Sequence, residues 1–133
     1  MIVETPVTLP LNGIQLAVAP KQYRFFTTTR SQGGPNPSLS LTITRNAKKR
    51  ATEQAGGFVV LVSNNGEFPA ISDFDAQSAT VTGHRVEDGT DSFTFETTST
   101  SPNVVFAIYN EGTAPLEASL TASLQVPGTL FLL

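Results

Sequence analysis

The stretch Asn-Val-Val-Phe-Ala-Ile-Tyr-Asn at residues 103–110 decides the fold of this chain, together with Phe-Val-Val-Leu-Val-Ser-Asn at residues 58–64. Each stretch is a short, almost continuous apolar run, rich in β-branched and aromatic residues and closed by polar turn formers. Runs of about 4–8 such residues are typical of strands that are buried on both faces. We therefore expect the two stretches to be partner strands at the centre of a β-structure.

The chain repeats part of its own pattern. After each central stretch the spacing Asn-x-Gly-x-x-Pro recurs, starting at Asn64 and again at Asn110. Before each of them comes a strand with alternating aromatic residues, Tyr23-x-Phe25 in the first half and Phe93-x-Phe95 in the second. Because only two imperfect copies exist, the pattern indicates related hairpins rather than a solenoid.

Alternation of apolar and polar residues predicts the remaining strands. The clearest examples are residues 38–45 and 116–124, which place aliphatic side chains on one face. Residues 7–11 and 14–18 also alternate, and Asn12-Gly13 between them predicts a tight hairpin turn. With about eight or nine strands separated by turns, the sequence predicts an all-β fold, an antiparallel β-sandwich of jelly-roll type.

Two segments do not fit the strand pattern. Residues 46–57 have no large apolar side chain, so we expect an exposed loop there. Residues 126–133 end in Leu130, Phe131, Leu132 and Leu133, an apolar tail that must either pack on its own sheet or be buried by a neighbour. We expect residues 1–133 to form a single domain, and we treat these four residues as a candidate interface of a homo-oligomer.

Composition narrows the function classes. The chain has 133 residues, only 14% of them charged, and a net charge of −3, whereas nucleic-acid binders usually carry a basic stripe. No nucleic-acid partner is therefore expected. The absence of cysteine excludes disulfides and thiolate chemistry. No apolar run approaches the roughly 20 residues of a membrane span, and the N-terminus has no signal-peptide pattern.

A series of motifs across roughly residues 14–125 carries a family resemblance. The motifs are Tyr23-x-Phe25, Leu39-x-Leu41-x-Ile43, Leu61-Val62-Ser63 with Pro69 and Phe74-Asp75, Phe106-x-Ile108-Tyr109-Asn110, and Leu120-x-Ala122. In this order they resemble the bacterial pre-peptidase C-terminal domain, a small jelly-roll module attached to secreted peptidases. The resemblance implies an extracellular or periplasmic location and a role in binding calcium or matrix.

Few residues offer catalytic chemistry. His84 is the only histidine, so a Ser-His-Asp triad or a histidine-ligated metal would have to use it. A surface histidine near the end of a strand is the simpler interpretation. We therefore expect no catalytic residue and no enzyme.

Two acidic groups have the oxygen ligands that calcium prefers. The better one is Asp73 and Asp75 with Glu67, and the second is Glu87-Asp88-x-x-Asp91. Ordinary turns favour the same residue types. Calcium is accordingly the one candidate cofactor, and otherwise none is expected.

Aromatic residues provide the candidate ligand-binding site. Tyr23 and Tyr109, with Phe26, would form an exposed platform for sugar rings, and Asn110 lies next to Tyr109. The basic residues Arg45, Lys48, Lys49 and Arg50 would face anionic polymers or simply keep a loop solvated. A protein or a polysaccharide is thus the expected partner.

Three hypotheses follow for the function. The first is a non-catalytic binding or accessory module that recognises an extracellular partner or polymer. The second is a self-associating structural sandwich, such as a shell, fibre or appendage subunit. The third, ranked last, is an enzyme that depends on His84.

Overall fold

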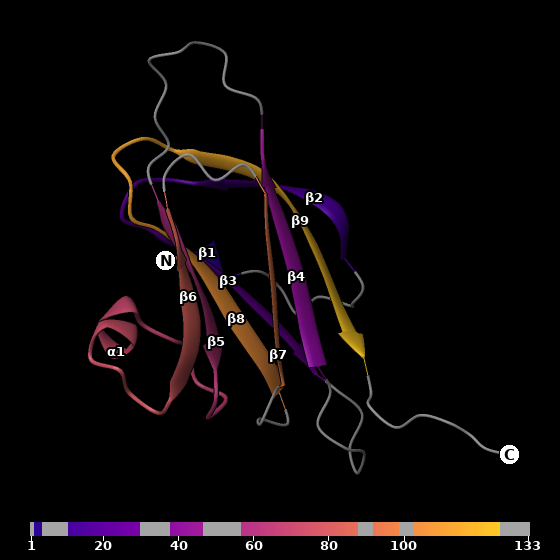
Figure 1. Cartoon of the computed structure of the whole chain (residues 1–133), viewed down its shortest axis with the longest axis vertical. Helices are drawn as coiled ribbons and strands as arrows, with labels where there is room; N and C mark the ends of the chain where they lie inside the picture. The colour runs from indigo at the N-terminus through magenta and orange to yellow at the C-terminus, as the bar shows by residue number, and fades with distance from the viewer. Residues whose placement is uncertain are drawn as a thin grey trace, which may run out of the picture.

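The computed structural model describes residues 2–3, 11–29, 38–46, 57–87, 92–98 and 103–125. These residues form two β-sheets packed face to face and one short helix (Figure 1). The elements are β1 (Ile2–Val3), β2 (Leu11–Val18), β3 (Tyr23–Thr29), β4 (Ser38–Arg45), β5 (Phe58–Ser63), α1 (Ile71–Asp75), β6 (Val81–Val86), β7 (Ser92–Thr98), β8 (Asn103–Asn110) and β9 (Leu116–Gln125). The expected all-β sandwich is confirmed.

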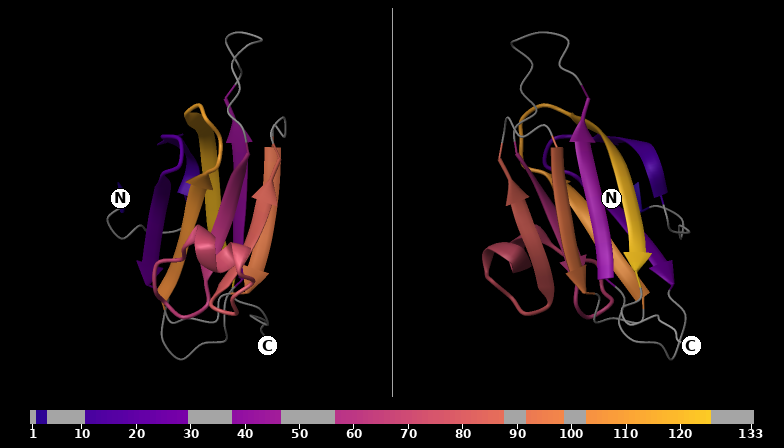
Figure 2. Two further views of the ribbon diagram at one scale, coloured as in Figure 1. Left: turned by 90° about the vertical axis from the view of Figure 1, so that its left-hand side faces the viewer. Right: turned by 45° about the vertical axis from the view of Figure 1, so that its right-hand side comes forward.

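The order of the strands follows a nested scheme. One sheet has the order β1-β3-β8-β5-β6 and the other β2-β9-β4-β7. The antiparallel pairs are nested along the chain: β5–β6 lies between the strands of β4–β7, that pair lies between β3 and β8, and all of them lie between β2 and β9. Figure 2 shows the two layers of this sandwich from further sides. Strand β1 adds to β3 in parallel.

The two central apolar stretches are partners, as expected. Strand β5 pairs with β8 antiparallel, with Leu61 opposite Ala107, and all six residues of β5 are buried. One face of these strands contributes to the core between the sheets, where the rings of Phe26 and Phe106 stack 4.9 Å apart. The other face lies under α1, which packs on β5 and β6. Because both faces of these strands are buried, apolar residues occupy successive positions and do not alternate with polar ones.

The alternating strands bury the expected side chains. Leu39, Leu41 and Ile43 of β4 are almost completely inaccessible, and so are Ala122 and Leu120 of β9. Leu124, which is opposite Leu39, is partly buried. In β3, Phe25 and Phe26 are both buried, on opposite faces of the sheet. Phe26 therefore belongs to the main core, and its assignment to an exposed platform was wrong.

The hairpin turn expected at Asn12-Gly13 is not formed. Leu11–Val18 is one strand, and the register against β9 shifts between Leu11 and Ile14. Gly13 has φ +66° and donates its N–H to Thr121 Oγ1 at 3.1 Å. A glycine with positive φ suits a β-bulge as well as a tight turn, which is why the dipeptide misled the prediction.

The helix α1 was not expected from the sequence, which predicted only a long turn region between residues 65 and 77. Of the predicted loop at 46–57, only the two end residues are described, and the predicted tail at 126–133 lies wholly outside the described residues. Within the described residues, no helix has the length and apolar character needed to cross a membrane.

Candidate functional site

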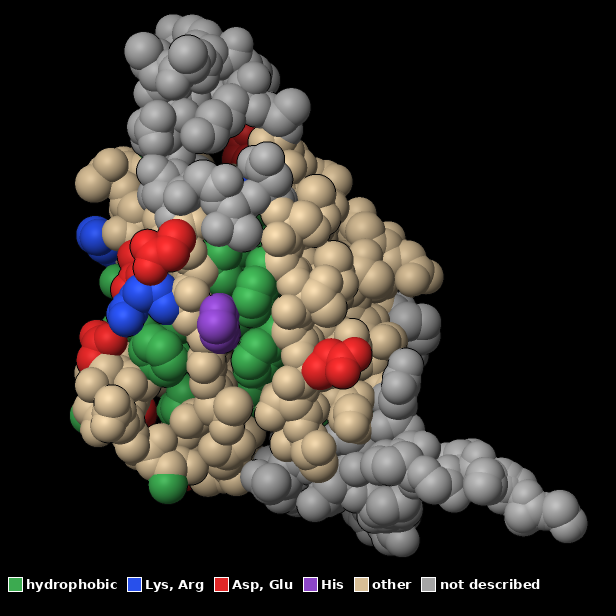
Figure 3. Space-filling view, in the orientation of Figure 1, with side chains coloured by type: hydrophobic (Ala, Val, Ile, Leu, Met, Phe, Trp, Pro, Cys, Tyr) green, Lys and Arg blue, Asp and Glu red, His purple; other side chains and the backbone are tan. Residues whose placement is uncertain are grey.

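The candidate site is the side of the sandwich formed by β6 and β7. Both strands end their sheets, and each pairs with one neighbour only among the described strands. We call this surface the open side. Figure 3 shows hydrophobic side chains gathered there beside the single histidine, in the space between the two strands.

Three aromatic side chains line the open side, and we call them the aromatic seam: His84 of β6 with Phe93 and Phe95 of β7. The rings of His84 and Phe93 stack at 4.9 Å with an interplanar angle of 15°, and Phe95 lies 6.5 Å from His84. Both phenylalanines are only partly buried and pack against the main core. At the seam, the core between the two sheets therefore reaches the surface.

The opposite side of the sandwich is closed differently. There β1 covers part of the edge of β3, and β2 carries the bulge at Gly13. Added strands and bulges are devices that prevent edge-to-edge pairing in natural sheets. Strand β7, in contrast, contains no proline, glycine or lysine. Among the described residues, the open side thus has neither an added strand nor a bulge.

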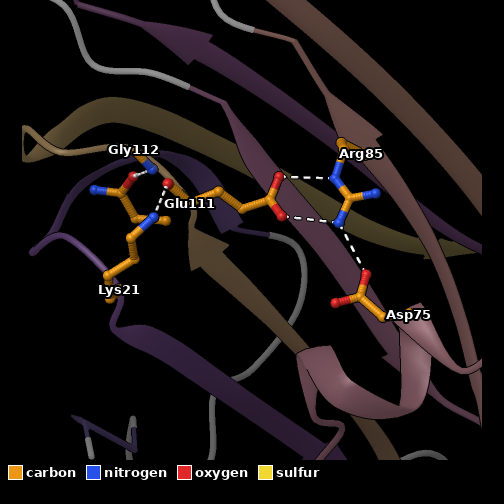
Figure 4. A network of polar contacts seen from close by, with 6 residues as sticks. Lys21, Asp75, Arg85, Glu111 and Gly112 are labelled. Carbon is orange, nitrogen blue, oxygen red and sulfur yellow. Dashed lines mark hydrogen bonds and ion pairs between the residues drawn. The ribbon is translucent and has the colours of Figure 1, made fainter.

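Next to the open side, Arg85 of β6 holds two carboxylates (Figure 4). Its Nε and one terminal nitrogen donate to the two oxygens of Glu111, each at 2.8 Å, and that terminal nitrogen also donates to Asp75 at 3.0 Å. These hydrogen bonds, first to Glu111 and then to Asp75, raise the pKa of the guanidinium. Arg85 also lies 5.2 Å from the ring centre of Phe74, so it connects α1 to the end of β8.

Asn110 organises the end of β8. Its amide nitrogen donates to the carbonyl oxygens of Val18 and Ala114, each at 2.9 Å, and its amide oxygen accepts from Gly112 at 2.8 Å. The side chain is 1% exposed. Its polar atoms are therefore engaged in holding two loops together.

The two predicted ligand-binding tyrosines lie side by side. Tyr23 and Tyr109 are opposite each other in β3 and β8, with ring centres 4.7 Å apart. The Tyr23 hydroxyl accepts a hydrogen bond of 2.9 Å from the Ile71 N–H, at the start of α1. Partial burial raises the pKa of Tyr109, and the charges around it, from Tyr23, Glu111 and Asp75, add to this effect. Both rings pack in a second apolar cluster under α1, and Asn110 is not part of it.

The predicted calcium ligands are not gathered into one group. Asp75 binds Arg85, and the described residues contain no group of three or more histidines, cysteines or carboxylates that could hold a metal ion. The second acidic group lies largely outside the described residues, since only Glu87 of it is described. Of the basic residues, Arg45 lies 5.0 Å above the ring of Phe58, and Lys48, Lys49 and Arg50 are outside the described part.

The sequence did not identify the aromatic seam as a site. The alternation Phe93-x-Phe95 was visible, but it is equally typical of a covered strand. Only the strand order shows that β6 and β7 are both edges and bring His84 to Phe93.

A search against protein-family models, curated proteins and solved structures finds no match for this chain. Its function is therefore inferred from its own residues.

Proposed function

We propose that this chain is a non-catalytic binding or accessory module that recognises an extracellular partner or polymer. The observation that carries the proposal is the open side, where His84 is exposed, Phe93 and Phe95 are partly exposed, and two edge strands have no further partner among the described strands. An apolar surface of this kind on a folded domain usually marks an interaction site.

The environment of His84 supports a role without catalysis. Its ring stacks on Phe93, and no hydrogen bond joins it to a carboxylate or hydroxyl among the described residues. A general base needs a hydrogen-bonded proton donor and a group that orients it. His84 is better suited to cover the core at the open side.

A thermal-shift panel tests the proposal: soluble glycans and matrix peptides, with calcium against EDTA as a separate arm. A ligand at a hundred times its dissociation constant adds about 2.7 kcal/mol to stability, which should raise the unfolding temperature by several degrees. We expect at least one glycan or peptide to do so. If calcium alone raised it, and the double variant Asp73→Asn/Asp75→Asn abolished the effect, the carboxylates would be the site. No shift with any addition would contradict the binding proposal.

A self-associating structural subunit is the second candidate. The free edges of β6 and β7 favour it, since an unprotected edge is a template for another chain. The apolar residues Leu130, Phe131, Leu132 and Leu133 would add a second contact. Light scattering on the whole chain and on a chain that ends at residue 125 tests it. A defined oligomer that is lost on truncation would support the tail as interface, and a monomer in both would contradict self-association.

A further inference from the structure

We infer that the open side binds an extended polypeptide segment, which adds to the free edge of β7 as an antiparallel strand and places a basic residue opposite Glu96. This inference rests on the proposed binding function and names its partner class. Three properties of β7 carry it: its backbone edge, its inward aromatic face and its charge.

Among the described strands, β7 has a neighbour on one edge only. Its seven residues pair with β4 from Ser92 to Thr98, and no described strand pairs with the other edge. A row of free N–H and C=O groups with strand spacing is matched by the main chain of another extended polypeptide, which is how peptides add to sheets. The edge of β6 is less suited, because α1 packs on its outer face and Arg85 is engaged there.

The side chains of β7 specify the apolar positions of the partner. Phe93 and Phe95 point toward the core and remain partly accessible at the open side. Residues directly opposite them on an added strand would lie about 5 Å away and interact as cross-strand pairs. The residue opposite Phe93 would also contact the ring of His84, which stacks on Phe93. Apolar, preferably β-branched, residues at alternating positions of the partner would therefore cover the aromatic seam.

The charge of this side specifies a basic residue. Glu96 is exposed on the outer face of β7, and it has no ion pair among the described residues. Glu87, directly after β6, is exposed and has no ion pair among the described residues either. The one cation of these two strands, Arg85, is held by Glu111 and Asp75. A lysine or arginine of the partner would form an ion pair with Glu96, which has none among the described residues.

The same charges favour a different polypeptide over a second copy of this chain. Two copies joined through β7 would place both Glu96 carboxylates on the same outer face of the joined strands, and like charges on adjacent strands are unfavourable. The partner that fits has the pattern apolar-basic-apolar-polar-apolar, read antiparallel to residues 97 to 93.

A fluorescent peptide, Thr-Val-Lys-Val-Thr-Val-Ser, is the probe, and its affinity is measured by fluorescence anisotropy. A second peptide carries Glu in place of Lys. We expect the Lys peptide to bind the wild-type chain about fivefold more tightly than the Glu peptide, and the variant Glu96→Lys to reverse this preference. Glu117→Lys is the matched control, because it makes the same charge change on the same outer face but on the interior strand β9. It should leave the preference unchanged.

Two further peptides distinguish backbone hydrogen bonding to β7 from an electrostatic attraction alone. One is N-methylated at its three Val residues and the other at its Lys and inner Thr, so that each lacks N–H groups on one edge. Strand addition predicts that only one of them loses binding. The inference would be overturned if both methylated peptides lost binding equally, if Glu96→Lys kept the wild-type preference, or if the Lys peptide did not bind. A dimer that occupies the open side would also overturn it. A glycan that stabilises the chain when no peptide binds would overturn this inference and leave the binding module standing.

Discussion

The side-chain amide of Asn110 donates a 2.9 Å hydrogen bond to the carbonyl oxygen of Val18, which links the end of β8 in one sheet to the end of β2 in the other. The two residues are 92 positions apart in the chain. Because the same amide also binds Ala114 and Gly112, one buried side chain fixes the loops at this end of the sandwich.

Asn110→Ala should lower the free energy of unfolding by about 2–3 kcal/mol, because it leaves three backbone groups without their partner in a buried place. Asn110→Asp should also destabilise the chain, since a carboxylate accepts from Gly112 but cannot donate to Val18. Asn65→Ala is the control: its more exposed amide oxygen accepts from the Glu67 N–H and the Ser63 hydroxyl in a similar turn, and we expect a smaller loss of about 1 kcal/mol. Urea unfolding measures all three, and equal losses for Asn65 and Asn110 would contradict the account.

Gly83→Ala should destabilise the chain by about 1–3 kcal/mol, as overpacking usually does. A Cβ at this position would lie 2.8 Å from the Val60 carbonyl oxygen and 2.9 Å from Phe74 of α1. Gly13→Asn is the comparison, because Gly13 has open space around it and a positive φ that Asn tolerates. Thermal unfolding should show a larger loss for Gly83→Ala, and the reverse order would count against the packing of α1 described here.

Tyr23→Phe should cost about 1 kcal/mol, because it removes the acceptor of the Ile71 N–H. Amide hydrogen exchange of Ile71 should become faster. Tyr109→Phe is the matched control on the opposite strand, since its hydroxyl makes no hydrogen bond with a described residue. Unchanged exchange at Ile71 in Tyr23→Phe would show that this bond does not hold the start of α1.

Stability should fall at alkaline pH in a way that depends on Tyr109. The pKa of this residue is raised in the folded chain from its usual 10.0, so the unfolded chain loses the proton first. The contribution is fully present below pH 10 and is lost as the pH rises through the folded-state pKa. Urea unfolding from pH 8 to 11 should show a steeper loss for the wild type than for Tyr109→Phe. Parallel curves would contradict the assignment.

The fold was largely predictable because strand periodicity is a local property of the sequence. The apolar runs of β5 and β8 and the alternation of β4 and β9 are read directly from neighbouring residues. The helix α1 was not predicted, since five residues carry little periodicity and are stabilised by contacts far away in the chain, such as Tyr23 with Ile71. Asn12-Gly13 was misread for a similar reason: only the pairing with β9 distinguishes a bulge from a turn.

The two copies of the Asn-x-Gly-x-x-Pro spacing form different hydrogen bonds. In the second copy the Asn110 amide oxygen accepts from Gly112. In the first copy Asn65, one residue later, accepts from Glu67, whereas Asn64 binds Thr82. The candidate site was less predictable than the fold, because the seam formed by His84 and Phe93 depends on which strands are edges.

The measurement that tests the central claim most directly is an NMR titration of the labelled chain with the Lys peptide, followed by hydrogen exchange of the backbone amides. We predict chemical-shift changes centred on β7 and the ring of His84, and slower exchange of those β7 amides that do not donate to β4. Changes centred instead on Tyr23 and Tyr109, with β7 unaffected, would contradict binding at the open side.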